Sequence, residues 1–279
     1  MSMATVSPVG TTTKSLPPGH YGISGLLRSE WTKLRTVRST MWTLGVTVVV
    51  GIGISALATA ETRAHWATMS PGNRLSFDPT STSLTALLFC QLAIGVLGVL
   101  VMSAEYGTGT IRATFSAAPR RPLVLAAKAA VFGLVALVVA EVVAFASFLV
   151  GQALLSAPAT HATLSTPGAL RAVVGTGLYL GVIGLFALGL ATIIRHTAGA
   201  ISAFVGILLV LPIIVQTLPN SIQDDIQRFL PLRIGAEMMS VNSGGGPNTF
   251  SPWTGFFVLC IYAAVVLVIG GILLVRRDA

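Results

Sequence analysis

The chain has 279 residues, of which 53% are hydrophobic and only 9% are charged, and its formal net charge is +8. Soluble domains usually carry roughly 25% charged residues, so this composition excludes a water-soluble globular protein. The lipid core offers the backbone no hydrogen-bond partner, so chain segments that cross it form helices or a closed barrel. The apolar stretches here are long and do not alternate with polar residues, which favours helices.

The chain begins with a segment, residues 1–22, that is rich in Ser, Thr, Pro and Gly. It lacks the apolar stretch of a signal peptide. Because such a composition cannot bury a core, we predict a disordered cytosolic tail. The remaining residues, 23–277, are expected to form one membrane domain.

An amphipathic helix is predicted over residues 24–38. Leu27, Trp31 and Leu34 recur at helical spacing and form one apolar stripe, while basic residues cover the other faces. Such a helix is expected to lie in the inner membrane interface, anchored by these three side chains. The alternative is a simple basic flank of the first span.

Six apolar stretches then reach the roughly 20 residues that a helix needs to cross the hydrocarbon core. They are residues 41–60, 82–103, 122–152, 172–194, 197–218 and 253–275. The predicted fold class is therefore an all-α integral membrane protein with six transmembrane helices, an N-terminal interfacial helix and a short cytosolic helix.

Basic residues orient this bundle, since cytosolic segments collect Lys and Arg. With the N-terminus inside, twelve of the 17 basic residues fall in inner segments. The sequence thus predicts a plasma-membrane protein with both termini in the cytosol. The positive charge is spread over several short loops rather than one basic domain, so we expect no nucleic-acid partner.

The loop between the second and third spans is the longest inner one. Gly107 and Gly109 are expected to end the second span, and residues 110–117 can then form a short helix with Ile111 and Phe115 on one face. A short cytosolic helix of this kind suits docking to another protein. An ordinary solvated loop is the alternative.

The outer loop, residues 218–252, contains two amphipathic stretches. Ser221 is predicted to cap the first, with Asp224 as the capping-box acid, and the second covers residues 232–240. These pieces suit shallow helices that dip into the outer leaflet. Alternatively, they rest on the surface of the bundle.

Glu141 is the one acid in the middle of a predicted span. A carboxyl group at this depth is costly and normally faces protein or a water-filled cavity. It is a candidate for the substrate path, for a structural hydrogen bond or for proton coupling. No catalytic constellation is found. His65 stands four residues after Glu61, but a single such pair is a weak signal, so neither a catalytic nor a metal site is expected.

Two segments together resemble a known family. They are LLRSEWTKLRTVRSTMW before the first span and EYGTGTIRATFSAAPRRPLVLAAK between the second and third. The chain resembles the permease subunit of a type-2 ATP-binding-cassette (ABC) exporter, with an elbow helix and a coupling helix at these places. The residues that match the second motif are Glu105, Gly107, Thr108, Gly109, Thr110, Pro119, Arg120 and Lys128.

The resemblance implies half of a transporter, which pairs with a second permease copy (identical or related) within membrane lipid. The chain has no phosphate-binding loop, so it is not expected to be an enzyme or to bind a cofactor, and ATP and Mg would be held by a separate ATPase subunit. The expected substrate is amphipathic (a drug, peptide or lipid-like molecule) and moves outward. The contacts expected to couple the chain to the ATPase are Glu30, Lys33, Arg35, Glu105, Arg112 and Phe115. A gradient-driven secondary transporter and a non-transporting sensor or interaction protein are the alternatives.

Overall fold

The computed structural model describes residues 22–118, 120–155, 159–242 and 249–277. Within these ranges all regular structure is helical, and six helices are long and apolar enough to cross a membrane. The predicted all-α membrane fold is confirmed. The spans are α2 (Arg38–Ala64), α5 (Leu87–Gly107), α7 (Arg121–Leu154), α8 (Ala169–Ile194), the α9–η2–α10 segment (Thr197–Val215) and α13 (Pro252–Arg277).

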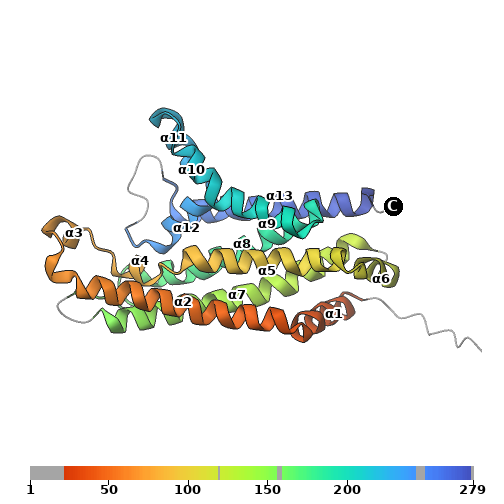
Figure 1. Cartoon of the computed structure of the whole chain (residues 1–279), viewed down its shortest axis with the longest axis horizontal. Helices are drawn as coiled ribbons and strands as arrows, with labels where there is room; N and C mark the ends of the chain where they lie inside the picture. The colour runs from red at the N-terminus through yellow and green to blue at the C-terminus, as the bar shows by residue number, and fades with distance from the viewer. Residues whose placement is uncertain (1–21, 119, 156–158, 243–248, 278–279) are drawn as a thin grey trace, which may run out of the picture.

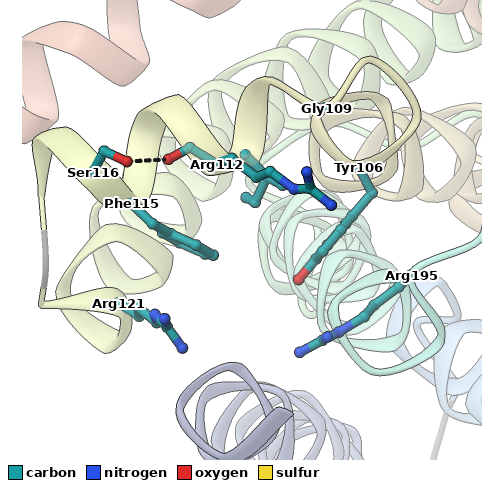
Figure 2. A pocket seen from close by; sticks show the side chains of 8 residues that line it. Tyr106, Gly109, Arg112, Phe115, Ser116, Arg121 and Arg195 are labelled. Carbon is teal, nitrogen blue, oxygen red and sulfur yellow. Dashed lines mark hydrogen bonds between the residues drawn. The ribbon is translucent and has the colours of Figure 1, made fainter. Parts of the chain in front are cut away.

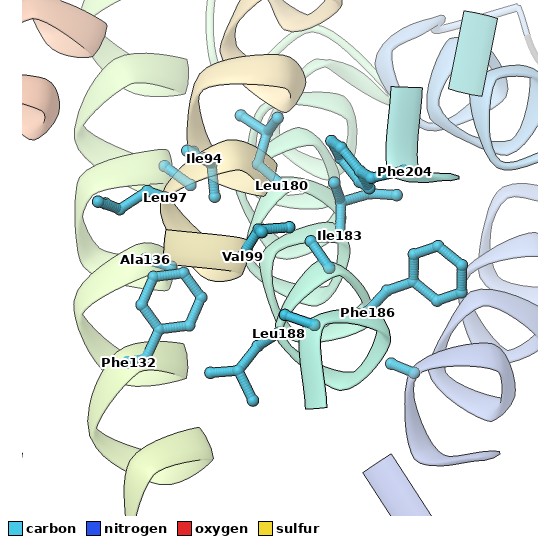
Figure 3. Packing of buried hydrophobic residues seen from close by; sticks show 14 of the residues in the cluster. Ile94, Leu97, Val99, Phe132, Ala136, Leu180, Ile183, Phe186, Leu188 and Phe204 are labelled. Atoms are coloured by element: carbon cyan, nitrogen blue, oxygen red, sulfur yellow. The ribbon is translucent and has the colours of Figure 1, made fainter. Parts of the chain in front are cut away.

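Helix α8 lies at the centre of the bundle and packs against α5, α7 and α13 (Figure 1). It is the most buried of the six spans. Leu180, Ile183 and Leu188 of α8 are fully buried and meet Ile94 of α5 and Phe132 of α7 in one core cluster (Figure 3). This arrangement explains why the helix is apolar on every side, because most of its surface is covered by other helices.

Small residues of α8 permit its close approach to α7. A Cβ atom at Gly177 would overlap the carboxyl group of Glu141, and one at Gly181 would lie 3.4 Å from Leu137. The Gly-x-x-x-Gly spacing therefore brings two helices of the same chain together, as small-residue pairs do in membranes. The helix that α8 approaches at these two glycines is α7, the third span.

One end of the bundle carries α1 (Ile23–Thr36), α6 (Thr110–Ala117) and the last turn of α13, and we call it the basal end (Figure 1). Helix α6 has the predicted bounds. Its start depends on Gly109, whose φ of 71° is a left-handed conformation that favours glycine. Helix α1 ends two residues earlier than predicted, because the chain is extended at Val37 before α2 begins. The predicted tail lies outside the described residues apart from Gly22.

The fifth span is interrupted where the sequence predicted a single stretch. Helix α9 (Thr197–Val205) passes into a π-helical turn, η2 (Gly206–Val210), and then into α10 (Leu211–Val215). Pro212 lacks the N–H that would bond to the carbonyl four residues earlier, and a wider turn is one way to accommodate that loss.

The opposite end holds short helices. The second span starts at Leu87 rather than at 82, because residues 82 and 83 belong to α4 (Pro79–Ser83), which Asp78 caps with two hydrogen bonds. Helix α3 (Pro71–Leu75) and the 3-10 turn Trp66–Thr68 also precede it. None of these three elements was predicted.

The outer loop forms α11 (Asn220–Gln227) and α12 (Pro231–Met239). The predicted cap at Ser221 is wrong: α11 already starts at Asn220, so Ser221 lies inside the first turn, and no side chain caps the helix. Pro231 opens α12, as proline often does at a first helical position. Helix α12 packs on α8 and α13, whereas α11 buries none of its residues and points away from the bundle (Figure 1).

Candidate coupling site

Four charged side chains meet inside the basal end. The Lys128 Nζ atom lies 2.6 Å from Glu30 Oε2 and 2.7 Å from Glu105 Oε1. The Lys33 Nζ atom lies 2.7 Å from Glu30 Oε1 and 2.9 Å from the same Glu105 Oε1. Two carboxylates and two ammonium groups thus form a closed, charge-balanced set, which we call the ionic junction.

The ionic junction is largely shielded from solvent. The side chains of Lys128, Glu30 and Glu105 are 3%, 5% and 12% exposed, whereas that of Lys33 is 38% exposed. Burial alone would lower the pKa of Lys33, but its hydrogen bonds to the two carboxylates and their negative charge raise it above its usual value. Removing one partner of a buried ion pair leaves an uncompensated charge and costs about 3–5 kcal/mol.

Three helices supply these groups, each for a local reason. Glu30 and Lys33 are three residues apart on α1 and so share one face. Glu105 stands two residues before the end of α5 at Gly107. Lys128 lies seven residues, or about 10 Å, inside α7, where a lone cation needs acidic partners.

The ionic junction also reaches α6. Lys33 Nζ lies 3.5 Å from Thr114 Oγ1, at the limit of a hydrogen bond. Ile111 of α6 is buried in the core cluster, and Phe115 packs against it. Helix α6 thus contacts the ionic junction through Thr114 and the core cluster through Ile111 and Phe115.

The predicted anchor stripe of α1 faces two environments. Leu34 is buried and Leu27 half-buried against the core of the bundle, whereas Trp31 is 49% exposed. This placement leaves Trp31 as the side chain free to meet lipid headgroups. The anchoring role of all three stays a prediction.

The other predicted contact residues lie apart from the ionic junction. Arg35 is exposed on α1. Arg112 and Phe115 of α6 point into a cavity of about 710 Å³ at the basal end (Figure 2). The further side chains that line this cavity include Tyr106, Ile111, Ser116, Arg121 and Arg195.

Glu141 lies far from both places. It is half-buried at the contact between α7 and α8, against Gly177, and its separation from Lys128 along α7 is about 20 Å. Its Oε2 atom is buried, and no hydrogen-bond partner for it occurs among the described residues. Glu141 thus lies in the middle of the bundle, and in the described part of the chain no cation pairs with it.

Sequence reasoning missed two members of this site. The sequence patterns give Lys128 no role beyond its place in a motif, and they single out nothing at Thr114. A charged residue two turns inside an otherwise apolar helix was the available signal for Lys128. Pro119 of the same motif lies outside the described residues.

No described group of His, Cys, Asp and Glu side chains could hold a metal ion. The six spans and the ionic junction define a multi-pass helical membrane protein whose amphipathic helix and loop helix are joined at one end. The family described as "ABC-2 family transporter protein" matches residues 26–219, so the chain belongs to that family. It is accordingly the membrane component, the permease subunit of an ABC transporter, and works with an ATP-binding subunit. No curated protein gives a significant match to the chain.

Proposed function

We propose that this permease subunit is half of an ATP-driven exporter in the plasma membrane, with the basal end and both termini in the cytosol. A second permease copy, identical or related, completes the pathway. A separate ATPase subunit holds ATP and Mg and docks on α1 and α6. The ionic junction carries this proposal, because it links both docking helices to the spans α5 and α7.

The mechanism follows from how the charges are shared. One oxygen atom of Glu105 accepts hydrogen bonds from both Lys33 of α1 and Lys128 of α7. Glu30 accepts hydrogen bonds from the same two lysines. No member can move alone without breaking a buried pair. A push on α6 or α1 from a docked ATPase would therefore move the basal ends of α5 and α7 as a unit.

The proposed orientation rests on the basic residues. Arg120, Arg121, Arg195, Arg276 and Arg277 all lie at helix ends or connections of the basal end. Such an excess of arginine marks the cytosolic side of membrane proteins.

An amphipathic substrate is supported by a second cavity, of about 460 Å³, beside the ionic junction. One part of its wall is charged or hydroxylated and includes Glu105 and Thr108, and another part is apolar and includes Leu97 and Leu100. A molecule with one polar and one apolar part would match both walls. Outward transport rests on the resemblance to type-2 exporters.

Docking can be tested with Phe115→Asp. Phe115 stacks with Arg121 at 5.4 Å, so an aspartate there has a cation nearby and the fold should tolerate it. We expect the tagged wild-type chain, purified from its own cells, to retain an ATP-hydrolysing subunit whose activity substrate stimulates, and the variant to lose that subunit. Leu75→Asp is the matched control, because Leu75 is 90% exposed at the opposite end of the bundle.

Retention of the ATPase and of transport by Phe115→Asp would refute α6 as the docking element. Transport that persists without an ATPase would favour the gradient-driven alternative. A stable complex with no transport of any substrate would favour the interaction protein.

Orientation needs a separate test. In a chain with Cys90 and Cys260 replaced by alanine, Arg112→Cys should react with a membrane-impermeant maleimide only from the cytosol. Gly72→Cys in α3 should react only from outside, since Gly72 is exposed at the other end with open space around it. The reverse pattern would overturn the orientation.

A further inference from the structure

The cavity of about 460 Å³ beside the ionic junction, which we call the junction cavity, carries no net charge. The charged side chains among the described residues that line it are the two acids and two lysines of the ionic junction. Each of these four groups already pairs with groups of opposite charge. The junction cavity therefore gives no net electrostatic advantage to an anionic or a cationic molecule.

Hydroxyl groups supply the rest of the polar side chains in the junction cavity. Thr43 Oγ1 donates to the Ser39 carbonyl at 2.9 Å, and Thr108 Oγ1 donates to the Ala104 carbonyl at 2.8 Å. Because the proton of Thr108 is engaged, the 2.9 Å contact between the hydroxyls of Thr110 and Thr108 has Thr110 as its donor. A hydroxyl has one proton and two lone pairs, so these three threonines can only accept from a ligand.

Two further hydroxyl groups of this wall keep both functions. Ser39 Oγ and Thr40 Oγ1 make no hydrogen bond within the described chain, so each can donate or accept. A ligand that matches the whole wall brings several donors and some acceptors. Hydroxyl groups provide both with one atom, whereas a quaternary ammonium lacks donors and a sulfate has acceptors only.

The polar and apolar parts of the junction cavity follow one another along α5. Thr108 lies at the basal end of this helix, and Leu97, Leu100 and Val101 line the cavity deeper in the span. From Leu97 to Thr108 the chain rises about 16 Å, close to the roughly 15 Å of hydrocarbon in one leaflet. Leu100 is 38% exposed on the surface of the bundle, so an apolar tail can reach this wall from the membrane.

We infer that the junction cavity binds an amphipath whose head group is uncharged and rich in hydroxyl groups, as in a glycolipid. Its hydroxyls would donate to Thr43, Thr108 and Thr110, and its tail would lie along Leu97 and Leu100. A charged head group would lose hydration there without gaining an unpaired opposite charge. Taking this molecule as the transported substrate rests on the proposed function, whereas the binding itself does not.

The binding test uses the full chain in nanodiscs of dioleoyl phosphatidylcholine, with radiolabelled probes that share a dodecyl tail and with empty nanodiscs as background. The probes are dodecyl glucoside, its tetra-O-methyl ether, dodecyltrimethylammonium and dodecyl sulfate. The ether keeps the neutral ring but has no donors. We expect the glucoside to bind at least about tenfold more tightly than the ether, the equivalent of two lost hydrogen bonds. Neither charged probe should bind as tightly as the glucoside.

The combined Thr43→Val and Thr110→Val variant tests the hydroxyl wall, since valine has the shape of threonine without the hydroxyl. It should reduce the preference for the glucoside over the ether to below about threefold. Binding of the ether itself should not change, which shows that the variant is folded. Thr62→Val is the matched control, because Thr62 donates to the Ala58 carbonyl at 2.8 Å in the same way at the opposite end of α2.

A second variant fills the junction cavity. Ala104 is exposed and lines it, so Ala104→Phe should fold and should weaken binding of all four probes about tenfold. Ala60→Phe is its control, on an exposed position at the other end of α2. In the complex with the ATPase, the glucoside should stimulate ATP hydrolysis, and Ala104→Phe should reduce this stimulation.

Three results of the binding test would overturn the inference. They are equal affinity for the glucoside and its ether, tighter binding of either charged probe, and a glucoside preference that survives the paired threonine variant. Stimulation of ATP hydrolysis that Ala104→Phe leaves unchanged would overturn the assignment of the bound molecule as substrate. The binding test needs neither ATP nor the ATPase, so failure of the docking proposal would leave its result unaffected.

Discussion

Two carboxyl groups on membrane-crossing helices of this chain have opposite surroundings. Glu105, near the basal end of α5, faces two lysines from two other helices at 2.7 and 2.9 Å. Glu141, in the middle of α7, packs against the backbone of Gly177 with no cation beside it, and its Oε2 atom finds no partner in the described chain. Whether a charged group inside a span holds helices together or stands apart from other charges therefore depends on its neighbours.

The largest effect should come from breaking the ionic junction at its most buried member. Lys128→Met leaves the two buried acids, Glu30 and Glu105, with only the partly exposed Lys33 as a cation. We expect the free energy of unfolding to fall by about 3–5 kcal/mol, measured by thermal unfolding in detergent. Arg38→Met, which removes an exposed basic group at the same end, should change it by less than about 0.5 kcal/mol.

A triple variant tests whether charge is the cause. Adding Glu30→Gln and Glu105→Gln to Lys128→Met removes all three buried charges and should recover most of the lost stability. If Lys128→Met alone is as stable as the wild type, the ionic junction does not hold the basal end together.

The next effect concerns the surroundings of Glu141. Gly177→Leu would place side-chain atoms where the carboxyl group lies, forcing α7 and α8 apart at an expected cost of about 1–3 kcal/mol. Adding Glu141→Ala makes room and should restore part of that loss. Gly53→Leu, on an open face of α2, should be neutral, and equal destabilisation by the two leucine variants would contradict the close packing seen here.

A smaller effect is expected at the exposed member of the ionic junction. Lys33→Gln should cost only about 1 kcal/mol, because Lys33 is 38% exposed to screening solvent and Lys128 still pairs with both acids. The double-mutant cycle with Thr114→Val reports whether α1 and α6 are energetically linked, and a coupling energy of zero would separate them.

The pH dependence of this contribution has a definite sign. The pKa of Lys33 is raised in the folded chain above its ordinary value of 10.5. Its contribution is therefore fully present below pH 10.5 and is lost only as the pH rises through the higher folded-state value. Plots of the free energy of unfolding against pH for wild type and Lys33→Gln should run parallel between about pH 6 and 9. They should converge only in strong alkali.

These features differ in how far the sequence could predict them. The spans and α6 follow from local pattern: apolar stretches of sufficient length, and a glycine turn before an amphipathic octet. Pairing of Glu30 with Lys33 also follows from spacing on α1. That Glu105 and Lys128 complete the set depends on how α1, α5 and α7 pack, which is a long-range property that no local pattern contains. The same is true of the cavity of about 710 Å³ at the basal end, whose arginines come from α6, α7 and the end of α8.

The short helices of the opposite end show a different limit. Asp78 and Ser70 cap α4 and α3 through side-chain hydrogen bonds, so the signals were present in the sequence. Each helix has only five residues, too few for a periodic pattern to stand out. At Ser221 the cap pattern is misleading, since the N-cap position of α11 is occupied two residues earlier, by Pro219.

The variant Glu141→Gln should change stability least, and its effect on transport should be the most informative. Glu141→Gln keeps the shape of the side chain and removes no ion pair, so the free energy of unfolding should shift by less than about 1 kcal/mol. Transport measured in vesicles then separates the three roles open to this group. A substrate contact predicts an altered substrate range, with cationic substrates losing most. Proton coupling predicts that transport loses its pH dependence for every substrate. Transport and substrate range that both match the wild type would leave Glu141 with packing against α8 as its only role, and the contrast with Glu105 would then be one between two kinds of structural acid.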